Sequence, residues 1–312
     1  FQSFKQFADG LSETKPSMKA AVYANILNVV FNYLLIYGIW IFPELGIIGA
    51  GVGTLISRVI MAILMYVMIV NKEKFKVYFQ NLWKEKIAKK TILKINKLGL
   101  PSALQMFFEF GVFTAAIWLA GTLGKNPQAA NQIALNLSSI TFMFAMGLGV
   151  VATIRVGNQY GLKDFKELRR ISFSIFLLIL ILDILFAVLF MIFNEFLPSL
   201  YLDVDDPINY LDNIEVVKIS AKLMIIAAFF QLFDGMQAVI LGALKGMQDV
   251  FIPTVITFIA YWVVAFPICY FAGLKWGYGS EGIWWGFLIG LACSAIMLLW
   301  RFNLITKRRI KN

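Results

Sequence analysis

The sequence contains no histidine and only two cysteines. Without histidine, the chain cannot build a Ser-His-Asp triad or an HExxH zinc site. Cys269 and Cys293 both lie inside apolar runs, which excludes a zinc knuckle and a secreted disulfide framework. The chain also lacks a GxxxxGK[ST] phosphate-binding loop. We therefore expect no enzymatic activity, no cofactor and no ATP bound to this chain.

Charged residues are scarce as well. They make up 15% of the 312 residues and apolar residues 60%, whereas a soluble globular chain has about 25% and about 45–50%. The net charge of +10 could suggest nucleic-acid binding, but the basic residues cluster between apolar runs, as in the cytoplasmic loops of membrane proteins. The sequence therefore predicts an all-α polytopic membrane protein whose partner is the lipid bilayer, with no nucleic-acid partner.

Eight segments are long and apolar enough to cross a bilayer, for which about 20 residues are needed. They are predicted at 20–42, 47–70, 98–121, 129–152, 171–193, 217–242, 252–272 and 281–304. Pro267 interrupts the seventh segment. Because a proline inside a helix leaves a carbonyl unpaired, it permits a bend there.

Basic residues gather in alternate loops. Nine lysines lie between residues 71 and 97, and further basic clusters lie at 155–170 and 301–311. The segment 194–215 is acidic instead, with Glu195, Asp203, Asp205, Asp206, Asp212 and Glu215. Because cytoplasmic loops are enriched in Lys and Arg, we expect a multi-pass protein of the inner (cytoplasmic) membrane with its basic loops and C-terminus in the cytoplasm.

An internal repeat relates the first two predicted spans to the last two. Three glycines recur at a constant offset of 233 residues, with Gly46, Gly49 and Gly53 corresponding to Gly279, Gly282 and Gly286. The same offset places the counterparts of the four middle spans before residue 1. We therefore expect four further helices upstream, in a twelve-helix protein of two parallel six-helix halves, which is a transporter design.

This arrangement predicts three parts of the chain. Residues 1–70 would hold the last two helices of an N-terminal lobe. Residues 71–97 would form a basic cytoplasmic loop between the lobes, and residues 98–312 a six-helix C-terminal lobe. We expect the transporter to be monomeric.

Two acidic residues, Glu109 and Asp234, are predicted at the middle of the membrane. Glu109 lies 11 residues beyond the cytoplasmic start of its span, and Asp234 lies 11 residues before Lys245. At about 1.5 Å per residue, both are roughly 16 Å deep. A charge there costs about 2.5–3.5 kcal/mol or more, so each is a candidate functional residue rather than only an acid bonded to a neighbouring helix. Two carboxylates at one depth can share Na⁺ or a proton.

Amide side chains accompany both acids. Gln105 lies one helical turn before Glu109, and Gln231 lies three residues before Asp234. These spacings predict a polar stripe facing protein rather than lipid, and either amide oxygen could join the carboxylates around Na⁺. Phenylalanines flank both acids, and their faces could receive an organic cation.

Other polar residues inside the predicted spans support weaker hypotheses. Asp183 has only apolar neighbours and is interpreted as a structural acid, whereas Arg58 is interpreted as a packed or snorkelling residue. Asn136 and Tyr261 belong to polar stripes along their helices. Such stripes either line a water-filled cavity or join helices by hydrogen bonds, and both interpretations stay open.

Several long segments together resemble the MATE family of multidrug and toxin extrusion transporters, and most of all its NorM-type bacterial branch. The resemblance covers essentially the whole chain. It is carried by FADGLSETKPSMKAAVYANILNVVFNYLLIYG at 7–38, PSALQMFFEFGVFTAAIWLAGTLG at 101–124, AANQIALNLSSITFMFAMGLGVVATIRVGNQYG at 129–161 and FDGMQAVILGALKGMQDVFIP at 233–253. On this resemblance, the eight predicted spans correspond to helices 5–12 of a twelve-helix, two-lobe fold.

The resemblance implies an antiporter that exports organic cations in exchange for Na⁺ or H⁺. It implies a C-lobe cation site at Glu109 and Asp234, with Phe230 one turn before the aspartate and Phe142 on the eighth helix nearby. Where relatives have tyrosine at these two positions, phenylalanine keeps the aromatic face but lacks the hydroxyl ligand. Asn131 stands where many members have histidine.

Two alternatives remain at this stage. A lipid-linked oligosaccharide flippase of the same superfamily would line its cavity with Arg and Lys for pyrophosphate, which the two mid-membrane acids disfavour. A membrane-embedded protein without transport activity is the second alternative. The absence of histidine argues against an intramembrane hydrolase of this kind.

Overall fold

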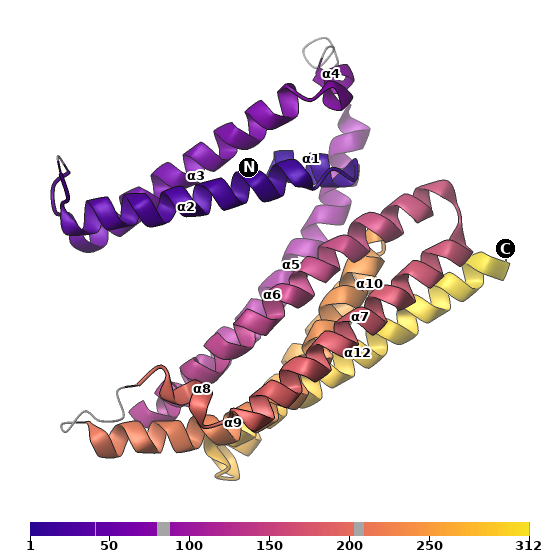
Figure 1. Ribbon diagram of the computed structural model, residues 1–312. Helices are drawn as coiled ribbons and strands as arrows, with labels where there is room; N and C mark the ends of the chain where they lie inside the picture. Colours follow the sequence, from indigo (N-terminus) through magenta and orange to yellow (C-terminus); the bar gives the residue numbers. More distant parts are fainter. Residues whose placement is uncertain (41, 80–87, 203–208, 312) are drawn as a thin grey trace. The chain divides into compact units, whose positions relative to one another are not determined.

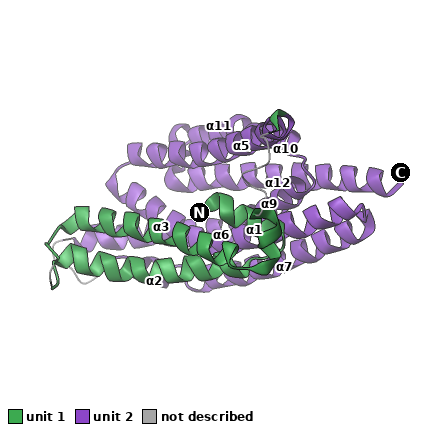
Figure 2. Cartoon of the chain, turned by 90° about the horizontal axis from the view of Figure 1, so that it is seen from above, with its two compact units in different colours: residues 1–89 green, residues 90–312 purple. Residues whose placement is uncertain are grey.

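The computed structural model describes residues 1–40, 42–79, 88–202 and 209–311. Every regular element in these ranges is a helix, because backbone groups inside a bilayer must pair within their own segment. The chain divides into two compact units, residues 1–89 and 90–312 (Figure 2). Five residues of the predicted basic and acidic loops, namely Lys84, Lys86, Asp203, Asp205 and Asp206, lie outside the described residues.

The first unit contains α1 (Gln2–Gly10), α2 (Lys15–Tyr37), α3 (Gly46–Val70) and α4 (Glu73–Phe79). The long helices α2 and α3 run side by side (Figure 1). Their close approach requires a glycine at position 49, where a Cβ atom would collide with the backbone of Leu35. The first span was predicted to end at residue 42, but α2 ends at Tyr37 because Gly38 adopts a left-handed conformation (φ +63°) and terminates the helix.

Helices α1 and α4 pack together near the end of α3. The ring of Phe7 contacts those of Phe75 and Tyr78, with centroids 5.5 and 5.6 Å apart. Glu13, which follows α1, accepts hydrogen bonds from Lys72, just before α4, and from Lys74 within α4. These two bonds lower the pKa of the Glu13 carboxyl from its ordinary value.

The second unit contains most of the helices. They are α5 (Lys89–Thr122), α6 (Lys125–Leu162), α7 (Phe165–Ile192), α8 (Phe196–Ser199), α9 (Tyr210–Gly246), α10 (Phe251–Phe258), α11 (Phe266–Tyr270) and α12 (Gly279–Lys311). Two π-helical segments, η1 (Ile259–Ala265) and η2 (Phe271–Lys275), alternate with α10 and α11. Among the described residues of the whole chain, eight helical segments are long and apolar enough to span a membrane, which confirms the predicted all-α fold.

Helix α9 is the centre of the second unit and packs against α6, α7 and α12. Small residues allow the closest of these contacts. A Cβ atom at Gly242 of α9 would collide with the backbone of Gly149 on α6, and the Thr153 hydroxyl donates to the Gly242 carbonyl at 2.9 Å. This packing holds α9 in place, which matters because α9 carries Asp234.

The seventh span departs from regular α-helix where the sequence predicts a bend. Pro267 lies in the first turn of α11, directly after the π-helical segment η1. Because proline has no N–H to donate, it cannot continue a regular hydrogen-bond ladder from the preceding turn. π-Helical turns are rare and occur often at functional sites, and η1 carries Tyr261.

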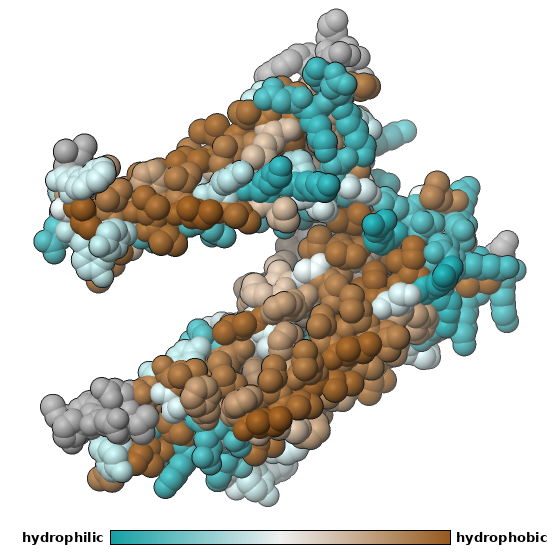
Figure 3. Space-filling view, in the orientation of Figure 1, coloured by the Kyte–Doolittle hydropathy of each residue, from teal (hydrophilic) through white to brown (hydrophobic). Residues whose placement is uncertain are grey.

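Apolar side chains cover the long helices, and hydrophilic ones gather towards helix ends (Figure 3). At one end of the second unit, Arg169 of α7 donates to Asn303 and Thr306 of α12, at 2.7 and 2.9 Å. At the other end, Lys222 of α9 lies 3.1 Å from Glu281 of α12. The predicted basic clusters of 155–170 and 301–311 thus share one end of this unit.

Candidate functional site

Glu109 and Asp234 line the same pocket, which has a volume of about 200 Å³. They lie 125 positions apart in the sequence and come from α5 and α9, and α6 completes the wall. The lining residues are Glu109, Phe110, Phe113, Leu135, Ser138, Ser139, Phe142, Phe230 and Asp234. The pocket therefore combines two carboxylates with four phenylalanine rings, and it includes both aromatic residues, Phe142 and Phe230, that the family resemblance assigns to the site.

Two polar side chains, one from α5 and one from η1, act on the Glu109 carboxylate. The side-chain nitrogen of Gln105, one turn earlier on α5, donates to Glu109 Oε2 at 2.7 Å. The Tyr261 hydroxyl from η1 interacts electrostatically with the Glu109 carboxylate, and it accepts a hydrogen bond from Gln237 Nε2 at 2.6 Å. Gln105, Gln237 and Tyr261 are all buried. Since charge-assisted hydrogen bonds fix geometry, the Gln105 amide orients Glu109 within the pocket.

Asp234 lies in a different environment. Its side chain is 6% exposed, and no hydrogen bond to its carboxylate occurs among the described residues. It interacts electrostatically with two other carboxylates, Glu109 and Asp183. A buried carboxylate next to other carboxylates must take up a proton or a cation to be stable. The site is therefore suited to holding positive charge.

Asp183 belongs to the same buried cluster, although the sequence showed no polar neighbour for it. It lies on α7 directly against Gly235 of α9, where a side chain would collide with its carboxylate. Within the described part of the chain, its Oδ2 atom has no hydrogen-bond partner. Asp183 thus acts electrostatically on Asp234 but does not line the pocket.

Gln231 does not accompany Asp234 in the way its spacing predicts. Its side-chain nitrogen donates to the backbone carbonyl of Asp183 at 3.4 Å and so links α9 to α7. Gln237, three residues after Asp234, donates a hydrogen bond to the Tyr261 hydroxyl instead. The sequence reasoning missed Gln237, although its spacing of three residues from Asp234 was the available signal.

The remaining candidates lie away from the carboxylate pocket. Asn136 accepts a hydrogen bond from the Tyr201 hydroxyl at 2.8 Å, and Asn131 accepts one from the Trp284 indole at 2.9 Å. Both therefore join segments of the second unit. Arg58 lies in the first unit, in a small polar pocket between α2 and α3 that also contains Asn28 and Thr54.

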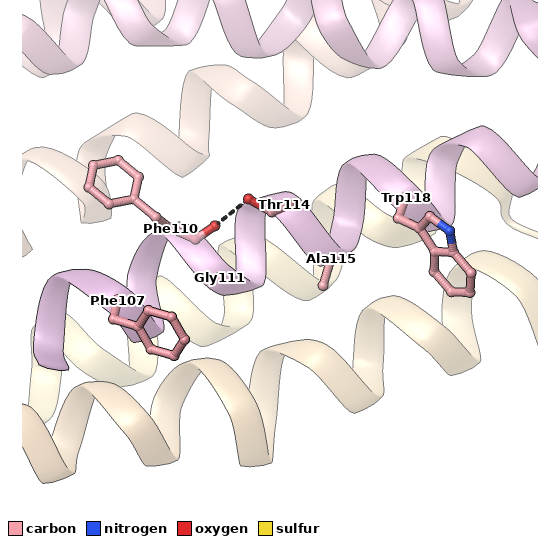
Figure 4. A pocket seen from close by; sticks show the side chains of 6 residues that line it. All are labelled: Phe107, Phe110, Gly111, Thr114, Ala115 and Trp118. Atoms are coloured by element: carbon pink, nitrogen blue, oxygen red, sulfur yellow. Dashed lines mark hydrogen bonds between the residues drawn. The ribbon is translucent and has the colours of Figure 1, made fainter.

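A second, apolar hollow runs along α5 (Figure 4). It is lined by Phe107, Phe110, Gly111, Thr114, Ala115 and Trp118. Phe110 also lines the carboxylate pocket, so this one ring borders both. The Thr114 hydroxyl is bonded to the Phe110 carbonyl at 2.9 Å, which leaves the hollow almost without polar atoms.

A protein-family model matches the part of the chain that contains the carboxylate pocket. The model of the MatE family matches residues 101–271, which include Glu109, Phe142, Phe230, Asp234 and Tyr261. The chain belongs to the MatE family. MatE membership confirms the family resemblance seen in the sequence and the expectation that the chain is not an enzyme. It also makes the chain a multi-pass membrane protein.

The MatE chain is similar to bacterial relatives along most of its length. It is 35% identical to the multidrug resistance protein NorM of Photobacterium profundum over 98% of this chain and 66% of that protein. It is 36% identical to NorM of Aliivibrio fischeri over 96% of this chain and 64% of that protein. The chain thus spans just under two thirds of the length of these relatives.

A solved structure shares the fold. The crystal structure of the eukaryotic MATE transporter AtDTX14 superimposes with a TM-score of 0.84 at 18% sequence identity, covering 99% of this chain and 67% of that one. At this level of identity the match establishes the MATE fold alone. It agrees with the eight-helix arrangement described above.

Proposed function

We propose that the full-length protein exports organic cations across the cytoplasmic membrane and that inward movement of Na⁺ or H⁺ drives this export. The observation that carries the proposal is the single pocket containing Glu109, Asp234 and four phenylalanine rings. Carboxylates attract a cation, and aromatic faces bind its organic part through cation–π contacts. No Lys or Arg occurs among the described residues of the lining, which disfavours a pyrophosphate-binding flippase.

Exchange of the drug cation for the coupling ion follows from the free-energy cost of leaving the buried carboxylates without a positive partner. Asp234 lies beside Glu109 and Asp183, and no hydrogen-bond donor to it occurs among the described residues. The site must hold a proton, a metal cation or an organic cation at each stage of the cycle. Binding of the drug cation and of the coupling ion is then mutually exclusive, and such negative coupling is what an exchanger requires.

We favour Na⁺ over H⁺ as the coupling ion. Na⁺ prefers hard oxygen ligands, and Glu109 and Asp234 supply carboxylate oxygens. Gln105 and Tyr261 can add an amide and a hydroxyl oxygen, because Gln105 donates to Glu109 and Tyr261 interacts with it electrostatically. Gln231 is a weaker candidate for this set than its spacing suggested, since its amide is directed to the carbonyl of Asp183.

We further propose that the basic end of the second unit faces the cytoplasm. That end contains Arg169, Arg309 and the C-terminal turn of α12, and Arg309 lies 6.0 Å from the Phe165 ring. The opposite end carries the ion pair Lys125–Asp212 at 2.5 Å. The excess of Lys and Arg at one end fits the charge asymmetry of membrane proteins.

Efflux from vesicles tests the proposed function. The full-length protein in inverted membrane vesicles should accumulate ethidium when a Na⁺ or a proton gradient is applied. Asp234→Asn should abolish this ion-driven uptake, while protein levels in the membrane stay unchanged. Glu195→Gln, an exposed acid beside α8, is the matched control and should behave as the unmodified protein. Full ion-driven uptake by Asp234→Asn would contradict the proposal.

A further inference from the structure

Positive charge is concentrated at one end of the second unit, where α7 begins and α12 ends. The two helices meet there, because Arg169 of α7 donates to Asn303 and Thr306 of α12. Figure 3 shows hydrophilic side chains gathered at this end, next to the C-terminus that Figure 1 marks. The basic residues of the two segments 163–170 and 301–311, here called the α7–α12 basic cluster, are Lys163, Lys166, Arg169, Arg170, Arg301, Lys307, Arg308, Arg309 and Lys311.

Acidic side chains neutralise only part of this cluster. Glu167 forms an ion pair with Arg170 at 3.6 Å, and Asp249 forms a closer one with Arg301 at 3.0 Å. Asp164 accepts a hydrogen bond from the backbone N–H of Glu167 at 3.0 Å and so caps α7. The other basic residues of the cluster form no ion pair within the described part of the chain. The cluster therefore has positive charge left for a partner.

Arg169 is the member of the cluster that the fold holds in place. Its Nη1 and Nη2 atoms donate to Thr306 Oγ1 at 2.9 Å and to Asn303 Oδ1 at 2.7 Å. The guanidinium carbon lies 4.8 Å from the centre of the Phe173 ring. All three partners are uncharged, so they fix the guanidinium without neutralising it. Because a guanidinium has five N–H donors in a planar fork that matches a phosphate group, these contacts leave donors for an anion.

An exposed apolar stripe continues from the cluster along α7. It follows Arg170 at helical spacing, its side chains are between 45% and 65% exposed, and it consists of Leu177, Ile181, Leu185, Val188 and Ile192. The opposite face of α7 packs against α6 and α9. From Arg170 to Ile181 the helix rises about 16 Å, and half the hydrocarbon core of a bilayer is about 15 Å thick. The upper part of the stripe therefore has the length of one lipid acyl chain.

We propose that this end of the second unit binds an anionic phospholipid. Its phosphate would lie on Arg169 and Arg170, and one acyl chain would lie along the apolar stripe of α7. Basic clusters at the membrane surface attract anionic head groups, whereas a zwitterionic head group carries an ammonium ion that the cluster repels. A free phosphate ion would use the cluster but not the stripe. This second ligand is separate from the carboxylate pocket, and the proposal does not rest on the coupling ion.

Native mass spectrometry of the purified, delipidated full-length protein measures this binding. Dioleoylphosphatidylglycerol and dioleoylphosphatidylcholine have the same acyl chains and differ in the charge of the head group. We expect the first phosphatidylglycerol molecule to bind at least tenfold more tightly than the first phosphatidylcholine. Inorganic phosphate at the same concentration should not displace it, because phosphate lacks the acyl chain. Equal apparent Kd values for the two lipids, or displacement by phosphate, would overturn the proposal.

A charge-removal variant locates the site. Lys166 and Arg170 are exposed and lie one turn apart, so Lys166→Gln/Arg170→Gln leaves the packing of α7 intact. At about fivefold for each basic residue, the apparent Kd for phosphatidylglycerol should rise about twentyfold. Lys218→Gln/Lys275→Gln removes two exposed lysines from the opposite end of the unit and is the matched control. An unchanged Kd in the first variant, or an equal rise in the control, would contradict the assignment.

Thermal unfolding provides an independent readout of the same site. Because a ligand that binds only the folded state raises stability, phosphatidylglycerol should raise the unfolding midpoint of the unmodified protein and of the control variant. Arg169→Gln should lose most of this rise. Its midpoint without lipid, compared with that of the unmodified protein, separates lost lipid binding from lost contacts to Asn303 and Thr306. A full lipid-dependent rise in Arg169→Gln would show that Arg169 does not hold the phosphate.

Discussion

Asp183 of α7 lies against Gly235 of α9 so closely that a Cβ atom at position 235 would overlap its carboxylate. Gly235→Ala should therefore force the two helices apart and lower stability by about 1–3 kcal/mol. The measurement is the thermal unfolding midpoint of the purified protein in detergent. Gly147→Ala on α6, where a Cβ atom meets nothing within 4 Å, should leave the midpoint unchanged or raise it slightly. Equal midpoints for the two variants would contradict this packing.

The carboxylate of Asp183 should be replaceable by an amide. Asp183→Asn keeps the shape but removes the ionisable group, and Asp183 Oδ2 has no partner among the described residues. Because Asp183 lies outside the pocket lining, we expect the variant to fold and to keep ion-driven ethidium transport. Transport is measured beside Asp234→Asn. Loss of transport in both variants would mean that Asp183 belongs to the ion site.

The hydrogen bond between Trp284 and Asn131 predicts a purely structural effect. Both side chains are fully buried, and the indole nitrogen donates to Asn131 Oδ1 at 2.9 Å. Asn131→Leu would leave the indole N–H unpaired and cost about 1–3 kcal/mol. The thermal midpoint should fall, while the ion dependence of transport stays unchanged. Asn136→Leu, at an exposed position on the same helix, should lower the midpoint less.

The ion pairs of Glu13 predict a pH dependence in the first unit. Lys72 and Lys74 lower the pKa of Glu13, so the ionised form favours the folded arrangement of α1 and α4. This stabilisation is present above the ordinary Glu pKa of about 4.3 and is lost as the pH falls through the lowered folded-state value.

Hydrogen exchange of α1 and α4 measures this effect. After correction for intrinsic rates, exchange should be faster at about pH 3 than at about pH 6, and Glu13→Gln should exchange fast at both. Glu44→Gln, an exposed acid between α2 and α3, is the control. If Glu13→Gln were as protected as the unmodified protein at the higher pH, the ion pairs would have no stabilising role.

Hydropathy and depth along the helices were sufficient to predict the eight spans and to place Glu109 and Asp234 at one depth. Long apolar segments have one low-energy conformation in a bilayer, and equal distances from the same end of two helices place two residues at one depth. These arguments use only length and composition, which the sequence contains. They do not depend on how each helix is rotated about its axis.

Rotation about the helix axis explains what the sequence could not provide. Residues three positions before and after Asp234 lie about 60° to either side of it, because each residue turns the helix by about 100°. Gln231 and Gln237 are therefore equivalent in the sequence, and only tertiary packing directs Gln231 to α7 and Gln237 to η1. The π-helical turns of η1, which place Tyr261 at Glu109, likewise depend on packing around Pro267.

The most direct test of the central claim is an equilibrium competition at the carboxylate pocket. Binding of radiolabelled tetraphenylphosphonium to the purified full-length protein is measured at increasing Na⁺ concentration and, separately, at decreasing pH. If one pocket holds either the organic cation or the coupling ion, the apparent Kd rises in proportion to one of these ions, and this dependence disappears in Asp234→Asn. An apparent Kd that is independent of both Na⁺ and pH, or an unchanged ion dependence in Asp234→Asn, would contradict the account.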